Sequence, residues 1–206
     1  MNLSVIVTGD LESNNYLLTN EKTGEGVLID CGDDGKKILA GIENANVRLK
    51  GILLTHGHAD HIAAVDEVSG RYSCPVYIHP FDEALLKRAL YNLSPQVLGR
   101  IVTLQTNAIH LKDRVDIAGF SFEVIHTPGH TDGSVCFRLG DLLFTGDTLF
   151  EGSVGGDFPP FGDLNKEIMS IRTKLFTLET DCVCYPGHGE RTSLFHEKEN
   201  NIFCRI

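Results

Sequence analysis

A run of seven residues, THGHADH at positions 55–61, constrains this chain more than any other stretch, because four of its side chains can bind a metal. The apolar run GILL at 51–54 precedes it and predicts a buried strand that would present these side chains at its end. Imidazole and carboxylate ligands suit zinc, and iron or manganese would fit the same ligands. The stretch therefore predicts a metal centre at a strand end.

The spacing within this stretch indicates two ions rather than one. His56 and His58 are two positions apart, so both side chains point to the same side of an extended segment. Asp60 and His61 follow at the turn into the next expected helix, where they can face a different point nearby. One short segment can therefore serve two adjacent metals.

Three further candidate ligands lie far downstream, each in a glycine-containing turn after an expected strand. His130 follows the pair at 128–129, and His188 follows the pair at 186–187. Both pairs are Pro-Gly, a combination that ends a strand and presents the next side chain at the tip of a turn. Asp147 could also form an Asx-turn or serve as a helix cap. We predict that these three residues converge with the histidine stretch on one two-metal hydrolytic site.

The order of expected elements indicates two sheets covered by helices. Strands are expected at 4–8, 16–19, 26–30, 49–55, 75–79, 115–118, 120–126, 135–139, 142–145 and 182–185. Helices are expected at 33–44, 62–68, 80–90, 164–178 and in part of the tail after 190. Residues 92–112 are expected to be loop, with a short strand near 101–104. Periodicity supports α/β and α+β equally, and we expect a four-layer αββα arrangement.

Length and charge narrow the class of protein. A chain of 206 residues fits one domain spanning 1–206, with a sizeable core. The formal net charge of -10 argues against a nucleic-acid-binding protein, which needs a basic face. The N-terminus has no basic region of a signal peptide, and no stretch approaches the ~18 apolar residues that span a membrane. We expect a cytoplasmic protein that acts on a small molecule, with the oligomeric state left open.

With these motifs the chain resembles the metallo-β-lactamase-fold hydrolases, and within them the short, single-domain, glyoxalase II-like (hydroxyacylglutathione hydrolase-like) branch. The matching motifs are THGHADH at 55–61, TPGHTDGS at 127–134, GDTLF at 146–150 and PGHGERT at 186–192, together with LIDCG at 28–32. The resemblance covers nearly the whole chain. It implies an αββα sandwich with the site at the shared edge of the two sheets.

The resemblance also implies a role for each candidate ligand. His56, His58 and His130 would hold the first divalent ion, Asp60, His61 and His188 would hold the second, and Asp147 would bridge the two. The ions would convert a shared water to hydroxide, which attacks the carbonyl of a thioester or ester of the S-lactoylglutathione class. Asp60 would also be the nearest proton acceptor. Asp30 is a candidate to orient a ligand, and a role in a turn or helix cap is equally open.

Two segments depart from the family pattern and bear on the substrate. Only a short tail follows His188, so we expect no C-terminal helical domain of the kind that helps full-length glyoxalase II enzymes bind glutathione. After GDTLF, relatives often have an arginine where this chain has Gly156. The aromatic residues of that region, Phe150, Phe158 and Phe161, are candidates for an apolar wall of the cleft. A rigid loop packed on the core is the equal alternative.

Other functions stay open at this point. Mononuclear-iron persulfide dioxygenases share the motif set. A lactamase is less favoured, because Asp147 stands where those enzymes usually have cysteine. The non-enzyme alternative is a metal-stabilised binding module, but a structural zinc needs only four closed ligands and this chain offers seven candidates.

Overall fold

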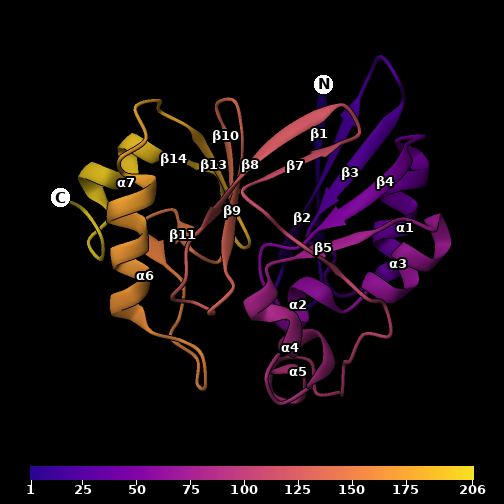
Figure 1. Ribbon diagram of the computed structural model, residues 1–206, viewed down its shortest axis with the longest axis horizontal. Coiled ribbons are helices and arrows are strands. Elements are labelled where there is room, and N and C mark those ends of the chain that lie inside the picture. Colours follow the sequence, from indigo (N-terminus) through magenta and orange to yellow (C-terminus); the bar gives the residue numbers. More distant parts are fainter.

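The computed structural model describes residues 1–206 and places two six-stranded sheets face to face (Figure 1). The first sheet contains, in spatial order, β1 (Asn2–Thr8), β2 (Ser13–Asn20), β3 (Glu25–Ile29), β4 (Arg48–Leu53), β5 (Val76–Ile78) and β6 (Ile109–His110). The second contains β14 (Thr192–Ser193), β13 (Val183–Pro186), β10 (Leu142–Gly146), β9 (Val135–Leu139), β8 (Phe120–His126) and β7 (Arg114–Ile117). A separate hairpin consists of β11 (Leu149–Phe150) and β12 (Ser153–Val154).

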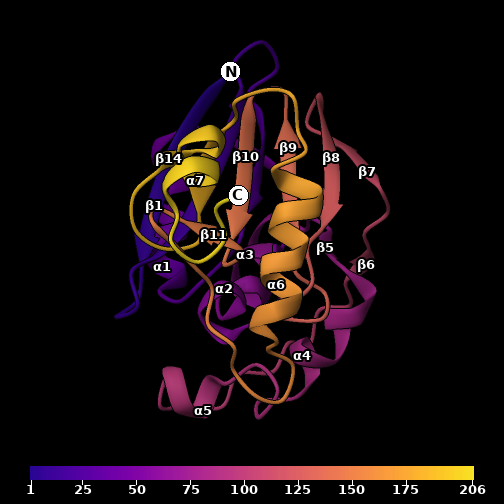
Figure 2. The ribbon, with the colours of Figure 1, turned by 90° about the vertical axis from the view of Figure 1, so that its left-hand side faces the viewer.

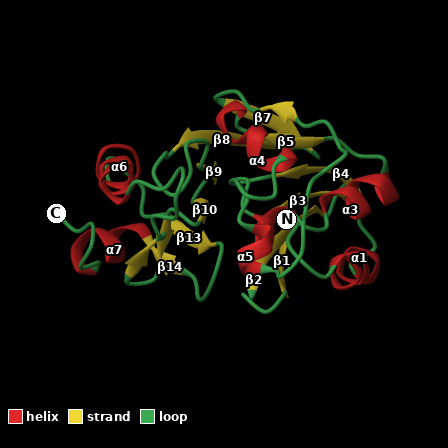
Figure 3. Ribbon diagram, turned by 90° about the horizontal axis from the view of Figure 1, so that it is seen from below, coloured by secondary structure: helices red, strands yellow, loops and turns green.

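Helices cover the outer face of each sheet (Figures 2 and 3). The first sheet is covered by α1 (Gly35–Asn44) and α3 (Val65–Tyr72), and the second by α6 (Leu164–Ser170), its continuation η2 (Ile171–Leu175) and α7 (Leu194–Asn200). The short elements α2 (Ala59–Ile62), η1 (Pro80–Asp82), α4 (Glu83–Lys87) and α5 (Ser94–Val97) lie toward one end of the first sheet (Figure 1). The four-layer αββα arrangement is therefore confirmed. No helix has the length and apolar character needed to cross a membrane.

Three separate apolar cores hold the four layers together. Neighbouring residues of a strand face opposite sides of a sheet, so Leu17 packs under the outer helices while Leu18 packs between the sheets. The rings of Phe122, Phe137 and Phe144 fill the space between the sheets from the second sheet. Full burial of one such side chain contributes about 1.5–3 kcal/mol to folding. A strand of this sandwich can therefore be apolar on both faces, because one face packs against the outer helices and the other against the opposite sheet.

The strand directions bring distant turns to one edge of the sandwich. In the first sheet, β4 runs parallel to β3 and β5, and in the second β10 runs parallel to β13. The carboxyl ends of parallel strands meet at the same edge of a sheet, where ligands commonly bind. The turns after β3, β4, β10 and β13 therefore meet there.

Several expected elements differ from the structure. The strand expected at 101–104 does not form, although Val102 and Leu104 are buried in the core beneath the outer helices of the first sheet. Their backbone N–H groups instead donate to the Ser94 hydroxyl and the Leu86 carbonyl. The apolar pattern there reflected burial rather than strand pairing. The helix expected at 62–68 is divided into α2 and α3, and the one expected at 80–90 ends at Lys87.

Candidate metal centre

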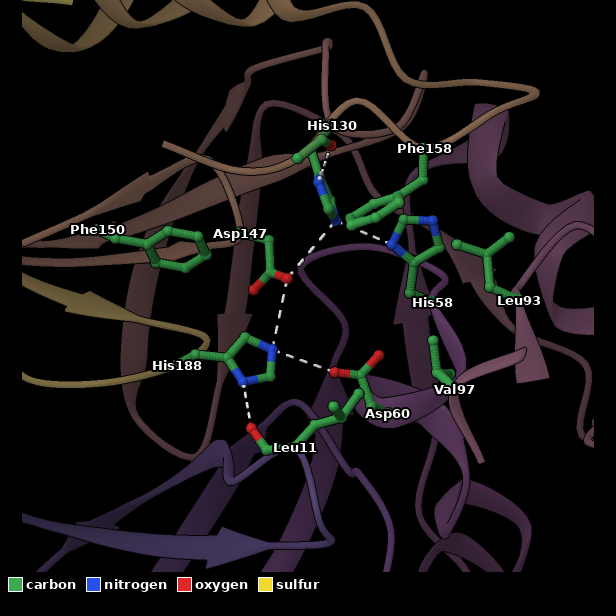
Figure 4. A pocket seen from close by; sticks show the side chains of 11 residues that line it. Leu11, His58, Asp60, Leu93, Val97, His130, Asp147, Phe150, Phe158 and His188 are labelled. Carbon is green, nitrogen blue, oxygen red and sulfur yellow. Dashed lines mark hydrogen bonds and ion pairs between the residues drawn. The ribbon is translucent and has the colours of Figure 1, made fainter. Parts of the chain in front are cut away.

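The predicted ligands come together at the base of a cavity of about 430 Å³ (Figure 4). Three groups of side chains have ligand atoms within 4.8 Å of one another. The groups are His56, His58 and His130; His56, His61 and Asp147; and Asp60, His61 and His188. These groups share members, so the residues form one continuous cluster of potential ligands.

The first group surrounds one point. His58 Nδ1 lies 2.9 Å from His130 Nε2. Asp147 Oδ2 lies 3.5 Å from His130 Nε2 and 4.0 Å from His56 Nε2. Three imidazole nitrogens and one carboxylate oxygen therefore face each other across distances that a single ion can span.

The second group surrounds a neighbouring point. His61 Nε2 and His188 Nε2 are 3.3 Å apart, and Asp60 Oδ2 lies 3.4 Å from the first and 3.1 Å from the second. Asp147 takes part here too, because its Oδ1 is 3.3 Å from His61 Nε2 and its Oδ2 is 3.5 Å from His188 Nε2. Asp147 thus lies between the two points, as a bridging ligand would.

These residues fit divalent ions on geometric and hydrogen-bonding grounds. Tetrahedral zinc with nitrogen ligands at about 2.0–2.1 Å keeps those ligands roughly 3.3 Å apart, close to the observed separations. His56 Nε2 is fully buried and has no hydrogen-bond partner, and buried Asp147 Oδ1 has only the His61 ring nitrogen, 3.3 Å away, beside it. A buried acceptor without a partner costs about 1–3 kcal/mol, which a bound ion would remove. The cluster can therefore hold metal.

Four of the five imidazoles are oriented through their other nitrogen. The Nδ1 atoms of His56, His61, His130 and His188 lie 2.8–3.1 Å from, respectively, Thr55 Oγ1, Asp30 Oδ2, the Gly156 carbonyl and the Leu11 carbonyl. An N–H on Nδ1 leaves Nε2 as the free acceptor, the tautomer that a metal ligand needs. His58 is reversed, with Nδ1 facing the site.

Asp30 stabilises two of these imidazoles at once. Its Oδ2 faces His61 Nδ1 at 3.0 Å and accepts from the Thr55 hydroxyl at 2.8 Å. That hydroxyl is also the partner of His56 Nδ1. Asp30 Oδ1 accepts from the Thr55 N–H at 2.8 Å, so the carboxylate also fixes the start of the histidine stretch. These contacts favour the orienting role over that of a simple turn residue.

Replacing Asp30 by asparagine is expected to weaken metal binding by about 10–100-fold, the usual effect of removing the partner of a ligating histidine. The asparagine NH2 is itself a donor, so it could not accept from the Thr55 hydroxyl and His61 Nδ1 as the Asp30 carboxylate does. Competition titration with a chromophoric chelator measures the change. Asp113→Asn, at an exposed position whose side chain makes no hydrogen bond, is the control. Equal affinities in the two variants would show that Asp30 does not orient the ligands.

Electrostatics divide the histidines into two classes. Burial lowers the pKa of His56 and His130, and it lowers that of His58 to about 3. Burial also acts to lower the pKa of His61 and His188, but Asp147 and Asp60 outweigh it. The pKa of His61 ends well above its ordinary value, and that of His188 at about 10. Without metal at neutral pH, the first three imidazoles are neutral and the last two carry protons.

Asp82 was not predicted from the sequence, yet it joins two of the ligand-bearing turns. Its carboxylate accepts from the Gly57 N–H at 2.9 Å, the Thr131 hydroxyl at 2.7 Å and the Gly133 N–H at 2.7 Å. Gly57 separates two candidate ligands, His56 and His58, and Thr131 follows a third, His130. Burial raises the pKa of Asp82 to about 6, partly offset by these three bonds. In the sequence, an acid two residues after Pro80 looks like an ordinary residue of a helix start, so no signal marks its role.

The predicted aromatic wall is only partly present. Phe150 and Phe158 line the cavity, but Phe161 does not; its ring packs against Tyr91 with centroids 5.2 Å apart. The remaining apolar lining comes from Leu11, Leu93 and Val97, which sequence reasoning missed. Other histidines stay outside the cavity; for example, the His79 ring is stacked on His126 at 4.1 Å.

Comparison with known proteins agrees with this arrangement. A family model described as the metallo-beta-lactamase superfamily matches residues 8–188. The chain is 32% identical over 213 aligned positions to the hydroxyacylglutathione hydrolase GloC of Haemophilus influenzae, with 98% of each chain covered. Among solved structures, the B3 metallo-beta-lactamase BLEG-1 is 34% identical with a TM-score of 0.93, covering 98% of this chain and 99% of that one. The di-iron-bound form of TTHA1623 is 33% identical with a TM-score of 0.86, covering 97% and 99%.

The matched region contains every candidate ligand. The two structures superpose on 98% and 97% of this chain, respectively. The similarity therefore extends beyond the short motifs to the complete fold. The chain belongs to the metallo-beta-lactamase superfamily.

Proposed function

We propose that this protein is a cytoplasmic hydrolase that binds two divalent ions and cleaves small thioesters or esters. The position of Asp147 between two groups of ligands, beside a cavity, carries the proposal. Membership of the metallo-beta-lactamase superfamily supports a metal-dependent hydrolase. The similarity to GloC supports a thioester as the substrate.

The ligands would be divided between two ions. His56, His58 and His130 would hold the first, Asp60, His61 and His188 the second, and Asp147 both. Ions bound there would polarise a carbonyl and bring the pKa of a bound water toward neutrality. In the overall reaction, water adds to the acyl carbon, the C–S bond breaks, and a carboxylic acid and a thiol are released.

Asp60 would act as a ligand first and accept a proton only transiently. Burial acts to raise its pKa, but His61 and His188 lower it to about 2. The Ser13 hydroxyl donates to Asp60 Oδ2 at 3.0 Å and fixes the side chain. The other oxygen makes no hydrogen bond and points away from His188 (Figure 4). A carboxyl group with so low a pKa is a good metal ligand and a weak base.

The donor set favours zinc but also suits iron or manganese. TTHA1623, a similar protein, binds two irons. Activity should therefore be assayed after separate reconstitution with Zn²⁺, Fe²⁺ and Mn²⁺, with the bound metal measured by elemental analysis. The most active form identifies the metal that best supports the reaction.

The test of function is a substrate panel on the reconstituted protein. We expect thiol release from S-lactoylglutathione or from simpler thioesters, with metal-free protein inactive. Oxygen uptake with glutathione persulfide would instead identify the persulfide dioxygenase alternative. No turnover of thioesters, esters or lactones by any metal form would contradict the proposal and favour a binding module.

β-Lactam hydrolysis is a second candidate, favoured by the similarity to the B3 metallo-beta-lactamase BLEG-1 over nearly the full length of both chains. A cyclic amide would need the same polarised carbonyl and activated water. Nitrocefin in the same panel tests it. Faster turnover of nitrocefin than of every thioester would make this the main activity.

A further inference from the structure

The cavity above the candidate metal centre combines metal-binding side chains with an apolar wall. Its apolar lining consists of Leu11, Leu93, Val97, Phe150 and Phe158, and the other lining residues are five candidate ligands and Gly156. No lysine or arginine lines it. A substrate's carboxylates or ammonium group would lose hydration against this wall and find no side-chain partner of opposite charge apart from the metal centre itself.

Leu93 is held on this wall in an unusual backbone conformation. Its φ is +63° and its ψ is 14°, the left-handed region that favours glycine and is unfavourable for leucine. A strained residue persists only where its surroundings determine it, and such residues occur often at functional sites. Surrounding contacts must therefore hold Leu93 in this conformation.

Asn92 imposes it. This side chain is fully buried, and its Nδ2 donates to the Leu85 and Val102 carbonyls at 2.9 and 3.0 Å. Its Oδ1 accepts from the Ser94 N–H at 3.0 Å, which closes the backbone tightly around Leu93. The Asn92 carbonyl accepts from the Ala59 N–H at 2.9 Å. Because Ala59 directly follows His58, the wall is tied to the candidate metal centre.

Phe158 lies beside the two histidines of the first ligand group that line the cavity. Its ring centroid lies 6.4 Å from that of His58 and 6.1 Å from that of His130. Figure 4 shows Leu93 and Phe158 beside His58, Val97 between His58 and Asp60, and Phe150 and Leu11 beside His188. Half of the Phe158 surface is exposed, so a bound group can still cover it. Leu93 and Phe158 therefore form an apolar surface beside the first ligand group.

We propose that this cavity selects substrates whose group beside His58 is uncharged and apolar, and that Leu93 is a specificity-determining residue. The substrate class is thioesters of medium-length alkyl acids with an uncharged thiol, rather than glutathione thioesters. This inference rests on the proposed hydrolase function for its substrate, while the apolar wall itself can be tested by binding alone.

The kinetic test compares two thiols that carry the same acyl groups. Acetyl, butanoyl, hexanoyl and octanoyl thioesters of N-acetylcysteamine and of glutathione are given to zinc-loaded protein. We expect kcat/KM to rise about fourfold for each CH2 that enters the cavity, the gain from burying one such group. We also expect the N-acetylcysteamine series to exceed the glutathione series by about tenfold at equal acyl length, because it carries no charge to desolvate. A flat series, or faster glutathione thioesters, would overturn the proposal.

A variant isolates the role of Leu93. Glycine adopts positive φ without strain, so Leu93→Gly removes the side chain while keeping the fold, which thermal unfolding checks. We expect the ratio of hexanoyl to acetyl kcat/KM to fall by about tenfold or more, as the wall is lost. Leu90→Gly, at an exposed position outside the cavity, is the matched control and should keep the wild-type ratio. The same ratio in both variants would show that Leu93 does not set specificity.

A binding measurement separates this inference from the proposed function. Alkyl hydroxamic acids from acetyl to octanoyl are uncharged in neutral solution and chelate metals as the hydroxamate after losing one proton, and calorimetric titration of zinc-loaded protein requires no turnover. Affinity that rises with chain length in the wild type, and less in Leu93→Gly, supports the apolar wall even if no thioester is cleaved. Thioester hydrolysis with affinity independent of chain length would leave the proposed function standing and overturn the wall.

Discussion

Replacing His58 by alanine is expected to lower kcat/KM for the best thioester by at least about 10³-fold, because hydroxide at neutral pH depends on the metal site that His58 completes. His58 Nδ1 lies 2.9 Å from His130 Nε2, and the imidazole makes no other side-chain hydrogen bond. Burial holds its pKa at about 3, so the ring is uncharged at neutral pH and its removal leaves no unpaired charge. The loss should therefore affect turnover much more than folding.

The control for this variant is His196→Ala, at an exposed position outside the cavity. Steady-state kinetics and thermal unfolding are measured for both variants after identical zinc loading. We expect His196→Ala to retain wild-type turnover, and both variants to unfold cooperatively. Undiminished turnover in His58→Ala would contradict the assignment of the first ligand group.

The second large effect is that the metal affinity of the two proposed sites should depend differently on pH. In the metal-free protein His188 has a pKa of about 10, and that of His61 is also raised well above its ordinary value. Between pH 6 and 8 a metal must displace protons from the second ligand group, so its affinity should rise with pH by about tenfold per unit for each proton released. The histidines of the first group have lowered pKa values and are already neutral, so its affinity should change little.

Two variants report the sites separately. His58→Ala leaves the second ligand group intact, and His188→Ala leaves the first. Zinc affinities at pH 6 and pH 8 come from titration against a chelator of known pH dependence. From pH 6 to pH 8 we expect the zinc affinity of His58→Ala to rise by at least about 100-fold. We expect the zinc affinity of His188→Ala to change by less than about threefold over the same interval. Similar pH dependences would mean that the second group does not hold protons as the geometry indicates.

Several of the candidate ligands could be singled out in the sequence because they have a local signal. His56 and His58 alternate along an extended segment, and His130 and His188 each follow Pro-Gly at a strand end. The parallel strands then bring these ends to one edge, which is a general property of such sheets. Asp30 had only a weak signal as the last residue of a strand motif. Its bonds to His61 and Thr55 emerge only once the fold brings them together.

The cavity wall and the support of the turns could not be predicted, because they depend on long-range contacts. Asp82 joins two turns that lie 25 and 51 residues away, at Gly57 and Gly133. Leu93 is in a segment without clear periodicity, and its conformation depends on Asn92 bonding to distant carbonyls. Phe161 fitted an apolar pattern but packs on Tyr91 instead of lining the cavity. Composition can suggest an apolar wall, but only packing shows which residues form it.

One carboxylate, Asp147, would join the two proposed metal sites. Anomalous X-ray diffraction from crystals of the zinc-loaded protein, recorded above and below the zinc edge, tests this arrangement most directly. We predict two anomalous peaks, one among His56, His58 and His130 and the other among Asp60, His61 and His188, with Asp147 between them. A single peak, or zinc bound away from these side chains, would contradict the account.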